Sequence, residues 1–547
     1  SVFVFMVFEN QMDLIATNAE LESRHIGTLL RLRIEQIVTG EQPGGSRRRC
    51  TPTPVPPTPT PVPKPPTAAP AATQPAATPT TAPPTKPPAT ATPAPTATPK
   101  PKQGGTLVIG LGTDIARWDI HNCSGMQALG IQRLVTELLT DHNWETGKLE
   151  PWLAESWESS PDATVWTIRL RKGVKFHDGT PFNAAAVKYN LERLLKIGLA
   201  KGTYDMIKSI EVKDEYTVVI NTTPFSPFMH LFTYAPSGMI SPTQAEKLGW
   251  DNYYKAPVGT GPYKFVEHVR GSQSVLVANE EYWGGRPYID KIIAKPIPEV
   301  SARIAALEAG DIQVALGVPP VELSRLASNP NIVPERASPA RTIYIGLNNQ
   351  WGPLKDKRVR QALNYAVDKN AINKNIFKGE ALVSDGPFTP QGFGYTKVGP
   401  YEYNPQKAKQ LLGEAGYANG FDVTLTFGPG RYLMDSEVVE AVASYLKDVG
   451  VRVKIEPLEW AAFETARRQP LETNKMQMYF IGWGCVTLDA DHCLKIYRPD
   501  QWPPKGDTTI FYANDRVQQL FDAARSTADE KKRLEAYAEL NKLLWDD

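Results

Sequence analysis

The most varied chemistry in the chain lies in one short stretch, FIGWGCVTLDADHC, at positions 480–493. It contains two carboxylates, Asp489 and Asp491, together with His492 and two cysteines. Such groups bind transition metals, but the stretch lacks the paired spacings C-x2-C or H-x3-H that mark zinc sites. Carboxylates at i and i+2 on a strand face the same side, so Asp489 and Asp491 could instead act as general acid and base.

A plainer interpretation gives these residues structural roles. Either Asp489 or Asp491 could cap the short helix that follows, because aspartate is a favoured N-cap. With 4 cysteines in the chain no disulfide framework is indicated, and Cys485 could pair with Cys493 or with Cys123. No G-x-S-x-G, H-E-x-x-H or P-loop motif is present. We therefore predict no catalytic residue, no metal site and no cofactor, with a carboxylate- or metal-dependent hydrolase using Asp489 and Asp491 as the alternative.

The elements that must position this stretch alternate in the α/β manner. The segment VWTIRLRKGVKF alternates apolar and polar residues from position 165, which predicts a half-buried strand. Asn183 and Asn404 are placed to cap the helices that follow them. Apolar residues at helical spacing predict a further helix over QALGIQRLVTELL, residues 127–139. The strand QMYFIGW leads directly into the stretch.

The composition limits the classes of function. The chain has 547 residues, 60 basic and 59 acidic side chains and a net charge of +1, so no overall field favours nucleic acid or anionic lipid. A hydrophobic fraction of 41% is ordinary for a globular protein. No apolar run is long enough for a membrane-spanning helix.

The N-terminal region contains an unusual tract of Thr, Pro and Ala. Residues 51–102 cannot form a packed core, and we expect a disordered, extended linker with a reach on the order of 150 Å. Cys50 directly precedes it and suggests a lipidated anchor. The sequence GGSRRRC before the linker is not that of a secretory signal, so residues 1–50 form an atypical segment.

Six blocks of residues 103–547 resemble the large solute-binding proteins of ABC importers, family 5, which includes peptide- and nickel-binding proteins. The blocks are VWTIRLRKGVKFHDGTPFNAAAV, VGTGPYKF, NEEYWGGRPYIDKI, SARIAALEAGDIQVA, GPLKDKRVRQALNYAVDKNAI and NPQKAKQLLGEAGYANGFDVTL. Their order and spacing are specific. The individual motifs also have structural interpretations, since VGTGPY is a turn that enters a strand.

The resemblance implies an α/β, two-lobed periplasmic-binding-protein-like fold of class II, cluster C type, with an extra domain inserted in lobe I. It places lobe I at 103–140 and 257–340, the extra domain at 141–256 and lobe II at 341–547. In the family the chain returns to lobe I after lobe II, so the C-terminal end is expected to be truncated.

The resemblance also implies a ligand site between the lobes. Trp460, Trp483 and Arg467 match pocket positions of oligopeptide binders. Two charged anchors of those relatives are replaced here, by Phe480 and Val486. A ligand site lined by these residues favours a neutral or flat-faced solute, such as an oligosaccharide or a blocked peptide, over free short peptides. Further candidates are Asp489 and, from the lobe I loop, Ser124, Gly125 and Met126.

The partners implied are the permease and ATPase subunits of an ABC importer, with no nucleic acid. We expect an extracytoplasmic monomer at the cell surface or in the periplasm, tethered to the membrane through Cys50, that closes by a hinge on its solute and is not an enzyme. A surface interaction protein displayed on a stalk is a third interpretation, which depends on the linker alone.

Overall fold

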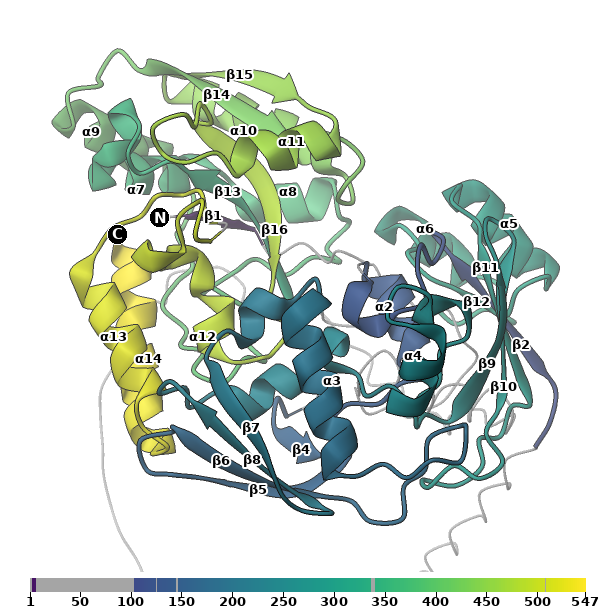
Figure 1. Cartoon of the computed structure of the whole chain (residues 1–547). Helices are drawn as coiled ribbons and strands as arrows, with labels where there is room; N and C mark the ends of the chain where they lie inside the picture. Colours follow the sequence, from purple (N-terminus) through teal and green to yellow (C-terminus); the bar gives the residue numbers. More distant parts are fainter. Residues whose placement is uncertain (1, 6–102, 124, 144–145, 336–339, 507) are drawn as a thin grey trace, which may run out of the picture.

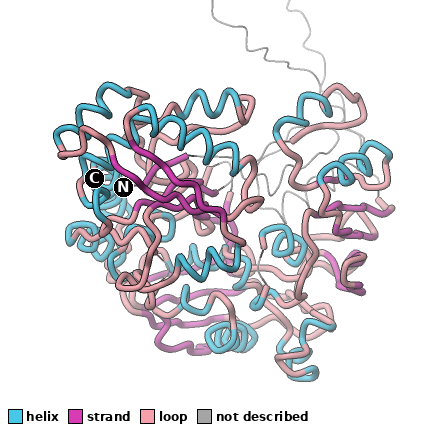
Figure 2. Tube along the Cα trace, turned by 90° about the horizontal axis from the view of Figure 1, so that it is seen from above, coloured by secondary structure: helices cyan, strands magenta, loops and turns pink. Residues whose placement is uncertain are grey.

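A computed structural model describes residues 2–5, 103–123, 125–143, 146–335, 340–506 and 508–547 (Figure 1). The strands form three larger sheets and one two-stranded sheet. The two five-stranded sheets lie apart, on opposite sides of the molecule, and helices pack around each of them (Figure 2). The architecture is therefore α/β and two-lobed, as predicted.

The first sheet forms the core of lobe I and has the strand order β12-β2-β11-β10-β9. β2 pairs in parallel with β11 and β12, whereas β10 pairs antiparallel with both of its neighbours. Helices α5 and α6 lie beside this sheet (Figure 1). The elements are β2 (Thr106–Leu111), α2 (Met126–Gln132), β9 (Tyr263–Val269), β10 (Gln273–Ala278), β11 (Lys291–Pro296), α5 (Val300–Ala309), β12 (Val314–Ala315) and α6 (Pro320–Leu326).

The second sheet is antiparallel, with the order β5-β6-β8-β7, and helix α3 packs against it. Trp166, Ile168 and Leu170 of β6 are buried while Val165 and Arg169 are exposed, which confirms the predicted alternation. The elements are β5 (Ala154–Ser159), β6 (Val165–Leu170), α3 (Ala184–Ile197), β7 (Ile207–Asp214), β8 (Thr217–Thr222) and α4 (Pro242–Leu248). The two-stranded sheet is formed by β3 (Thr140–His142) and β4 (Leu149–Pro151).

The third sheet forms lobe II, with the order β1-β13-β16-β14-β15. β14 pairs in parallel with β15 and β16, and β13 pairs antiparallel with β16 and β1. The elements are β1 (Val2–Phe5), β13 (Arg341–Leu347), α7 (Lys357–Ala366), α8 (Lys369–Asn375), α9 (Pro405–Glu414), β14 (Phe421–Phe427), α10 (Asp435–Asp448), β15 (Val451–Pro457), α11 (Trp460–Arg467), β16 (Met478–Gly484), α12 (Ala490–Cys493), α13 (Asp515–Arg525) and α14 (Glu530–Asp546).

Apart from β1, each of the three larger sheets falls within one of the predicted domain ranges. The two-stranded sheet crosses the predicted boundary at 140, because β3 begins at Thr140. The boundaries themselves remain a prediction. The C-terminal segment of lobe II forms hydrogen bonds with the domain that contains the second sheet. Ser226 donates its backbone N–H to the carbonyl of Arg525 over 2.8 Å, and Ala528 donates to Pro161 over 3.2 Å. The linker and Cys50 lie outside the described residues.

The N-caps predicted from the sequence at Asn183 and Asn404 are confirmed. Asn183 accepts a hydrogen bond from the backbone N–H of Ala186 and caps α3, and Asn404 caps α9 in the same way. The helix predicted over residues 127–139 is wrong in length, because α2 ends at Gln132. The carbonyls of Leu134 and Val135 accept hydrogen bonds from Tyr263 and Gly261 instead of continuing a helix.

Candidate functional site

A pocket of about 160 Å³ lies beside the ends of β13 and β16. Every residue that lines it belongs to lobe II, between positions 341 and 509. The lining comprises aromatic, basic and small polar side chains: Arg341, Tyr344, Arg431, Tyr432, Trp460, Glu464, Arg467, Arg468, Tyr479, Ile481, Gly482, Trp483, Ile496, Thr508 and Thr509. The lining therefore brings together three of the predicted residues, Trp460, Trp483 and Arg467.

Two tryptophans form flat walls of the pocket. Trp460 is the first residue of α11 and stacks on Phe463, with ring centroids 5.3 Å apart. Trp483 comes from β16 and stacks on His492 with centroids 5.5 Å apart. The indole Nε1–H of Trp483 donates a hydrogen bond to the backbone carbonyl of His492 over 3.1 Å. These contacts hold both indoles in fixed orientations.

Four arginines give the pocket a positive charge. The guanidinium of Arg431 lies 5.0 Å from the ring centres of both Tyr432 and Trp460, a cation–π arrangement. Arg467 and Arg468 both bind Glu464, at 2.9 and 2.8 Å. With Arg341 at the start of β13, four guanidiniums stand against the one carboxylate of the lining. The net charge of the lining favours an anionic group on the solute.

These arginines argue against the neutral solute that the sequence led us to expect. Of the four, only Arg467 was predicted from the sequence, whereas Arg341, Arg431 and Arg468 were not. Arg431 lies in the GPGRY loop after β14, and Arg341 is the first residue of β13. A charged residue just past the carboxyl end of a core strand is a signal that could have pointed to Arg431, since ligands bind there in α/β sheets. Arg341 reaches the same edge because β13 is antiparallel to β16 and pairs it with Gly484.

Phe480 and Val486, which were predicted to contact the solute, are not among the lining residues of the pocket. Phe480 is only 1% exposed and packs edge-on against Tyr432 within the core of lobe II. Val486 is half-buried in the loop that follows β16. Because β-strand side chains alternate, Phe480 faces away from the side of Tyr479 and Trp483.

Asp489 and Asp491 are buried in ion pairs and do not reach the pocket. Asp489 caps α12, as predicted, and binds Arg533 at 2.5 Å. Asp491 binds Arg525 at 2.5 Å. Burial alone would raise the pKa of Asp491, but the charge and hydrogen bonds of Arg525 hold it below its usual value. Neither carboxylate is placed to serve as a general acid or base.

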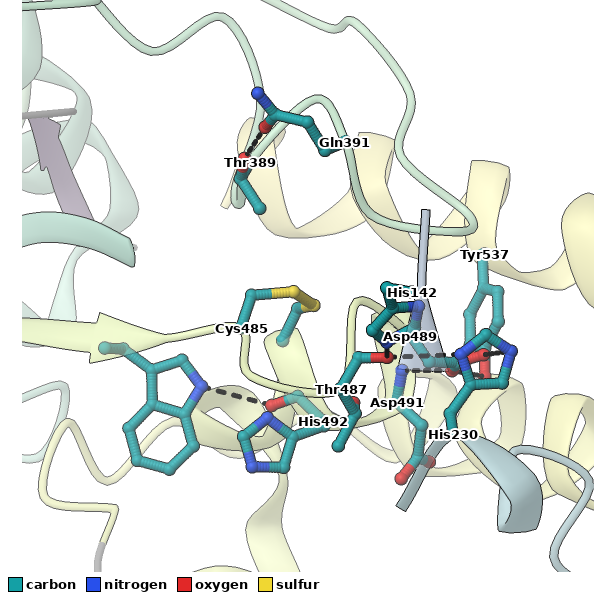
Figure 3. Close-up of a disulfide and its surroundings, with 12 residues drawn as sticks. His142, His230, Thr389, Gln391, Cys485, Thr487, Asp489, Asp491, His492 and Tyr537 are labelled. Atoms are coloured by element: carbon teal, nitrogen blue, oxygen red, sulfur yellow. Dashed lines mark hydrogen bonds and ion pairs between the residues drawn. A yellow bond between two sulfur atoms is a disulfide. The ribbon is translucent and has the colours of Figure 1, made fainter. Parts of the chain in front are cut away.

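The structure joins Cys485 to Cys493 in a disulfide (Figure 3). Cys123, the other partner considered, is buried in the core of lobe I. Within the described parts of the chain, no three His, Cys, Asp or Glu side chains are grouped so as to hold a metal ion.

The loop between Cys485 and Cys493 also contacts the inserted domain, which contains the second sheet. The carbonyl oxygen of Thr487 accepts hydrogen bonds from His142 Nε2 at 2.8 Å and His230 Nδ1 at 3.1 Å (Figure 3). His142 Nε2 and His230 Nδ1 therefore each carry a hydrogen. The pKa of His230 is lowered by burial, which the charge of Asp489 opposes.

The lobe I candidates are only partly described. Gly125 is exposed and precedes α2, whereas Ser124 and the side chain of Met126 lie outside the described residues. Among the described residues, no helix has the length and apolar character needed to cross a bilayer.

The sequence is similar to bacterial solute-binding proteins, both in a family model and in individual relatives. Residues 148–503 match the model of the bacterial extracellular solute-binding proteins, family 5, middle region. The glutathione-binding protein GsiB of Pectobacterium atrosepticum is 34% identical over 407 residues, covering 72% of this chain and 78% of that protein. GsiB of Escherichia coli K12 is 31% identical, covering 81% and 87%.

Solved structures are similar in fold. DppA of Helicobacter pylori, in complex with the peptide STSA, has a TM-score of 0.70 at 29% identity and covers 81% of this chain and 91% of that one. NikZ of Campylobacter jejuni, in complex with Ni(L-His), has a TM-score of 0.68 at 28% identity, with coverage of 81% and 90%. AppA of Bacillus subtilis, in complex with a nonapeptide, has a TM-score of 0.65 at 28% identity, with coverage of 82% and 92%.

Proposed function

The chain belongs to the family 5 bacterial extracellular solute-binding proteins of ABC importers, and from that premise we propose that its solute is a small acidic peptide, with glutathione as the first candidate. Proteins of this family bind solutes and work with the permease and ATPase of their importer, so the chain is a binding protein and not an enzyme.

The observation that carries this proposal is the set of arginines in the lobe II pocket. The lining contains the Arg467–Glu464 ion pair and three further guanidiniums, those of Arg341, Arg431 and Arg468. It therefore has an excess of positive charge. A solute with free carboxylates can form charge-assisted hydrogen bonds there, often bidentate with arginine. Trp460 and Trp483 then supply flat apolar faces for the rest of the molecule.

A neutral solute is a poorer match to this lining. An oligosaccharide would stack on the indoles, but it has no negative charge to complement a lining with four guanidiniums and one carboxylate. The relatives and structural neighbours likewise do not support the preference for sugars expected from the sequence. Glutathione combines two carboxylates with a peptide backbone, and it is the solute named for the GsiB relatives.

Calorimetric titration of the purified chain tests the proposal. The panel comprises glutathione, glutathione diethyl ester, in which both carboxylates are blocked, a free neutral tripeptide and a neutral trisaccharide. We expect glutathione to bind and the diester to bind at least about tenfold more weakly. Tight binding of the trisaccharide without binding of glutathione would overturn the proposal.

A pair of arginine variants locates the effect. Arg431→Ala removes a guanidinium that faces the pocket, and we expect it to weaken glutathione binding by roughly tenfold or more. The matched control is Arg452→Ala, since Arg452 is an exposed arginine of the same lobe that pairs with Asp422 outside the pocket. Equal affinities of the two variants would show that the arginine pocket is not the binding site.

We also propose that the chain is attached to the membrane at its N-terminal side. The chain acts as a monomer that is tethered through a lipid on Cys50, with the Thr/Pro/Ala linker as spacer. Metabolic labelling with a fatty-acid analogue, followed by comparison with Cys50→Ser, tests the tether. Equal labelling of both chains would contradict it.

A further inference from the structure

Trp483 lines both the pocket and a second, much smaller cavity. That cavity, of about 10 Å³, shares Tyr344, Trp483 and Ile496 with the main pocket. It is also lined by Cys485 and Cys493. Its volume is roughly that needed for one water molecule. Trp483, Tyr344 and Ile496 thus lie between the two cavities, and the two cysteines line only the smaller one.

The disulfide connects the two backbone positions that fix Trp483. Cys485 follows Trp483 by two residues and comes directly after β16, which ends at Gly484. Cys493 directly follows His492, whose ring stacks on the Trp483 indole and whose carbonyl accepts the indole N–H. The bond brings the Cα atoms of Cys485 and Cys493 to 4.4 Å. The strand that bears Trp483 and the helix that holds its ring are therefore tied together beside the ring.

The rest of the loop is held by other contacts. Asp489 and Asp491 fix α12 to Arg533 of α14 and Arg525 of α13. On the other side, the carbonyl of Thr487 receives two histidine hydrogen bonds (Figure 3). These contacts hold α12 in place without the disulfide. The covalent bond adds a restraint between α12 and the end of β16.

We propose that the Cys485–Cys493 disulfide is a positioning pair that keeps Trp483 in place as a fixed partition, and so limits the size of the solute group that the pocket accepts. This inference rests on the proposed function. Without the bond, the Trp483 indole gains freedom to leave His492, and the small cavity joins the main pocket. A bulkier group on the solute then finds room against Cys485 and Ile496.

A measurement without ligand tests the restraint itself. The full chain is labelled with 5-fluorotryptophan, and the Trp483 resonance is assigned by its loss in Trp483→Phe. We expect this fluorine resonance to shift or broaden in the double variant Cys485→Ser/Cys493→Ser, and also in the unmodified chain after reduction with a phosphine. The control Cys123→Ser should leave it unchanged. A Trp483 resonance unaffected by both treatments would overturn the inference.

A second measurement tests selectivity, with glutathione and S-hexylglutathione as the solutes. In the oxidised chain we expect glutathione to bind about tenfold more tightly than the S-hexyl compound, and we expect loss of the disulfide to abolish most of that difference. An unchanged ratio would overturn the inference even where both compounds bind. Failure of both compounds to bind any form would count against the proposed solute, while the fluorine spectrum would still decide the role of the disulfide. Reduction of the folded chain covers the case in which the serine variant does not fold.

Discussion

At the scale of single residues, the buried histidines of lobe I and its inserted domain have a defined protonation state. His121 is fully buried, and its Nε2 lies 2.9 Å from the carbonyl oxygen of Gly238. Its Nδ1 lies 2.9 Å from Arg193 Nη1, which also binds Asp119. Nε2 must therefore carry the proton, because Nδ1 accepts from a guanidinium that has no lone pair to offer. A second proton on His121 would face the charge of Arg193.

The pKa values of two histidines are lowered accordingly. Burial, and then the charge of Arg193, lower the pKa of His121 to about 4, against the opposing effects of Asp119 and the Gly238 carbonyl. Burial also lowers the pKa of His177 to about 4, although the Gly261 carbonyl opposes this shift. In the unfolded chain both side chains bind a proton near pH 6.5.

Stability should therefore fall as the pH is lowered from 6.5 toward 4. Over this interval the unfolded chain binds protons that the folded chain does not, so the free energy of unfolding decreases. We expect a loss on the order of 2 kcal/mol for each histidine between pH 6.5 and 5. Urea denaturation at several pH values measures it, and His121→Gln should flatten the dependence. An identical slope in that variant would contradict the assignment to His121.

At the scale of elements, the VGTGPY turn is a close contact between two chain segments. The turn passes so near the end of α2 that a Cβ on Gly259 would lie 2.1 Å from the carbonyl oxygen of Val135. A Cβ on Gly261 would lie 2.4 Å from the carbonyl oxygen of Leu134. The glycines thus permit the hydrogen bonds that end α2 and start β9. This geometry agrees with the structural interpretation of the motif.

Replacement of one of these glycines should destabilise the lobe. In Gly259→Ala the added methyl group meets backbone and not a movable side chain, so we expect a loss of about 3 kcal/mol in the free energy of unfolding. The control is Gly202→Ala, where nothing lies within 4 Å of the added Cβ. Urea denaturation of both variants at one pH provides the comparison, and similar stabilities would refute the steric argument.

Much of the element order is local in origin and could be predicted. The caps at Asn183 and Asn404 and the alternation of β6 each depend on a few neighbouring residues. The end of α2 could not be predicted, because it is set by the turn at Gly259–Gly261, more than a hundred positions away. The apolar spacing of Leu134 and Leu138 reflects burial in the lobe cores rather than a helix.

The candidate site was predictable only in part, for a similar reason. The two tryptophans were found through a resemblance, and the cap at Asp489 through its residue type. Arg341 and Arg431 come from separate segments that meet only when β13 and β14 join β16 in one sheet. The partner of Cys485 was left open, because spacing alone does not decide between a neighbour eight positions away and a distant cysteine.

At the scale of the whole molecule, the pocket is one-sided. All of its lining residues belong to lobe II, so lobe I contributes none of them in this arrangement. A solute held there would keep one face open to water. Tyr234 belongs to the inserted domain, and the charge of Arg341 opposes the rise in its pKa caused by burial. The inserted domain therefore lies near the lobe II pocket, and an approach of lobe I would enclose the solute.

We expect solute binding to bring the lobes together. Val321 on α6 of lobe I and Thr465 on α11 of lobe II are both exposed, and they carry spin labels through cysteine substitution in a Cys50→Ser background. Their distance distribution, measured by electron–electron double resonance, should shorten when glutathione is added. The reason is that contacts from lobe I to the solute are available only in the closed form, so binding favours that form.

A second pair of spin labels, both in lobe I, is the control for distance changes that do not come from lobe closure. Val321 and Val269 both belong to lobe I and are exposed, so their separation should stay constant with and without glutathione. Glutathione diethyl ester should leave the inter-lobe distance unchanged, since it lacks the charges that the arginines recognise. If glutathione binds by calorimetry while the inter-lobe distance stays the same, the solute is held by lobe II alone and closure plays no part in its capture.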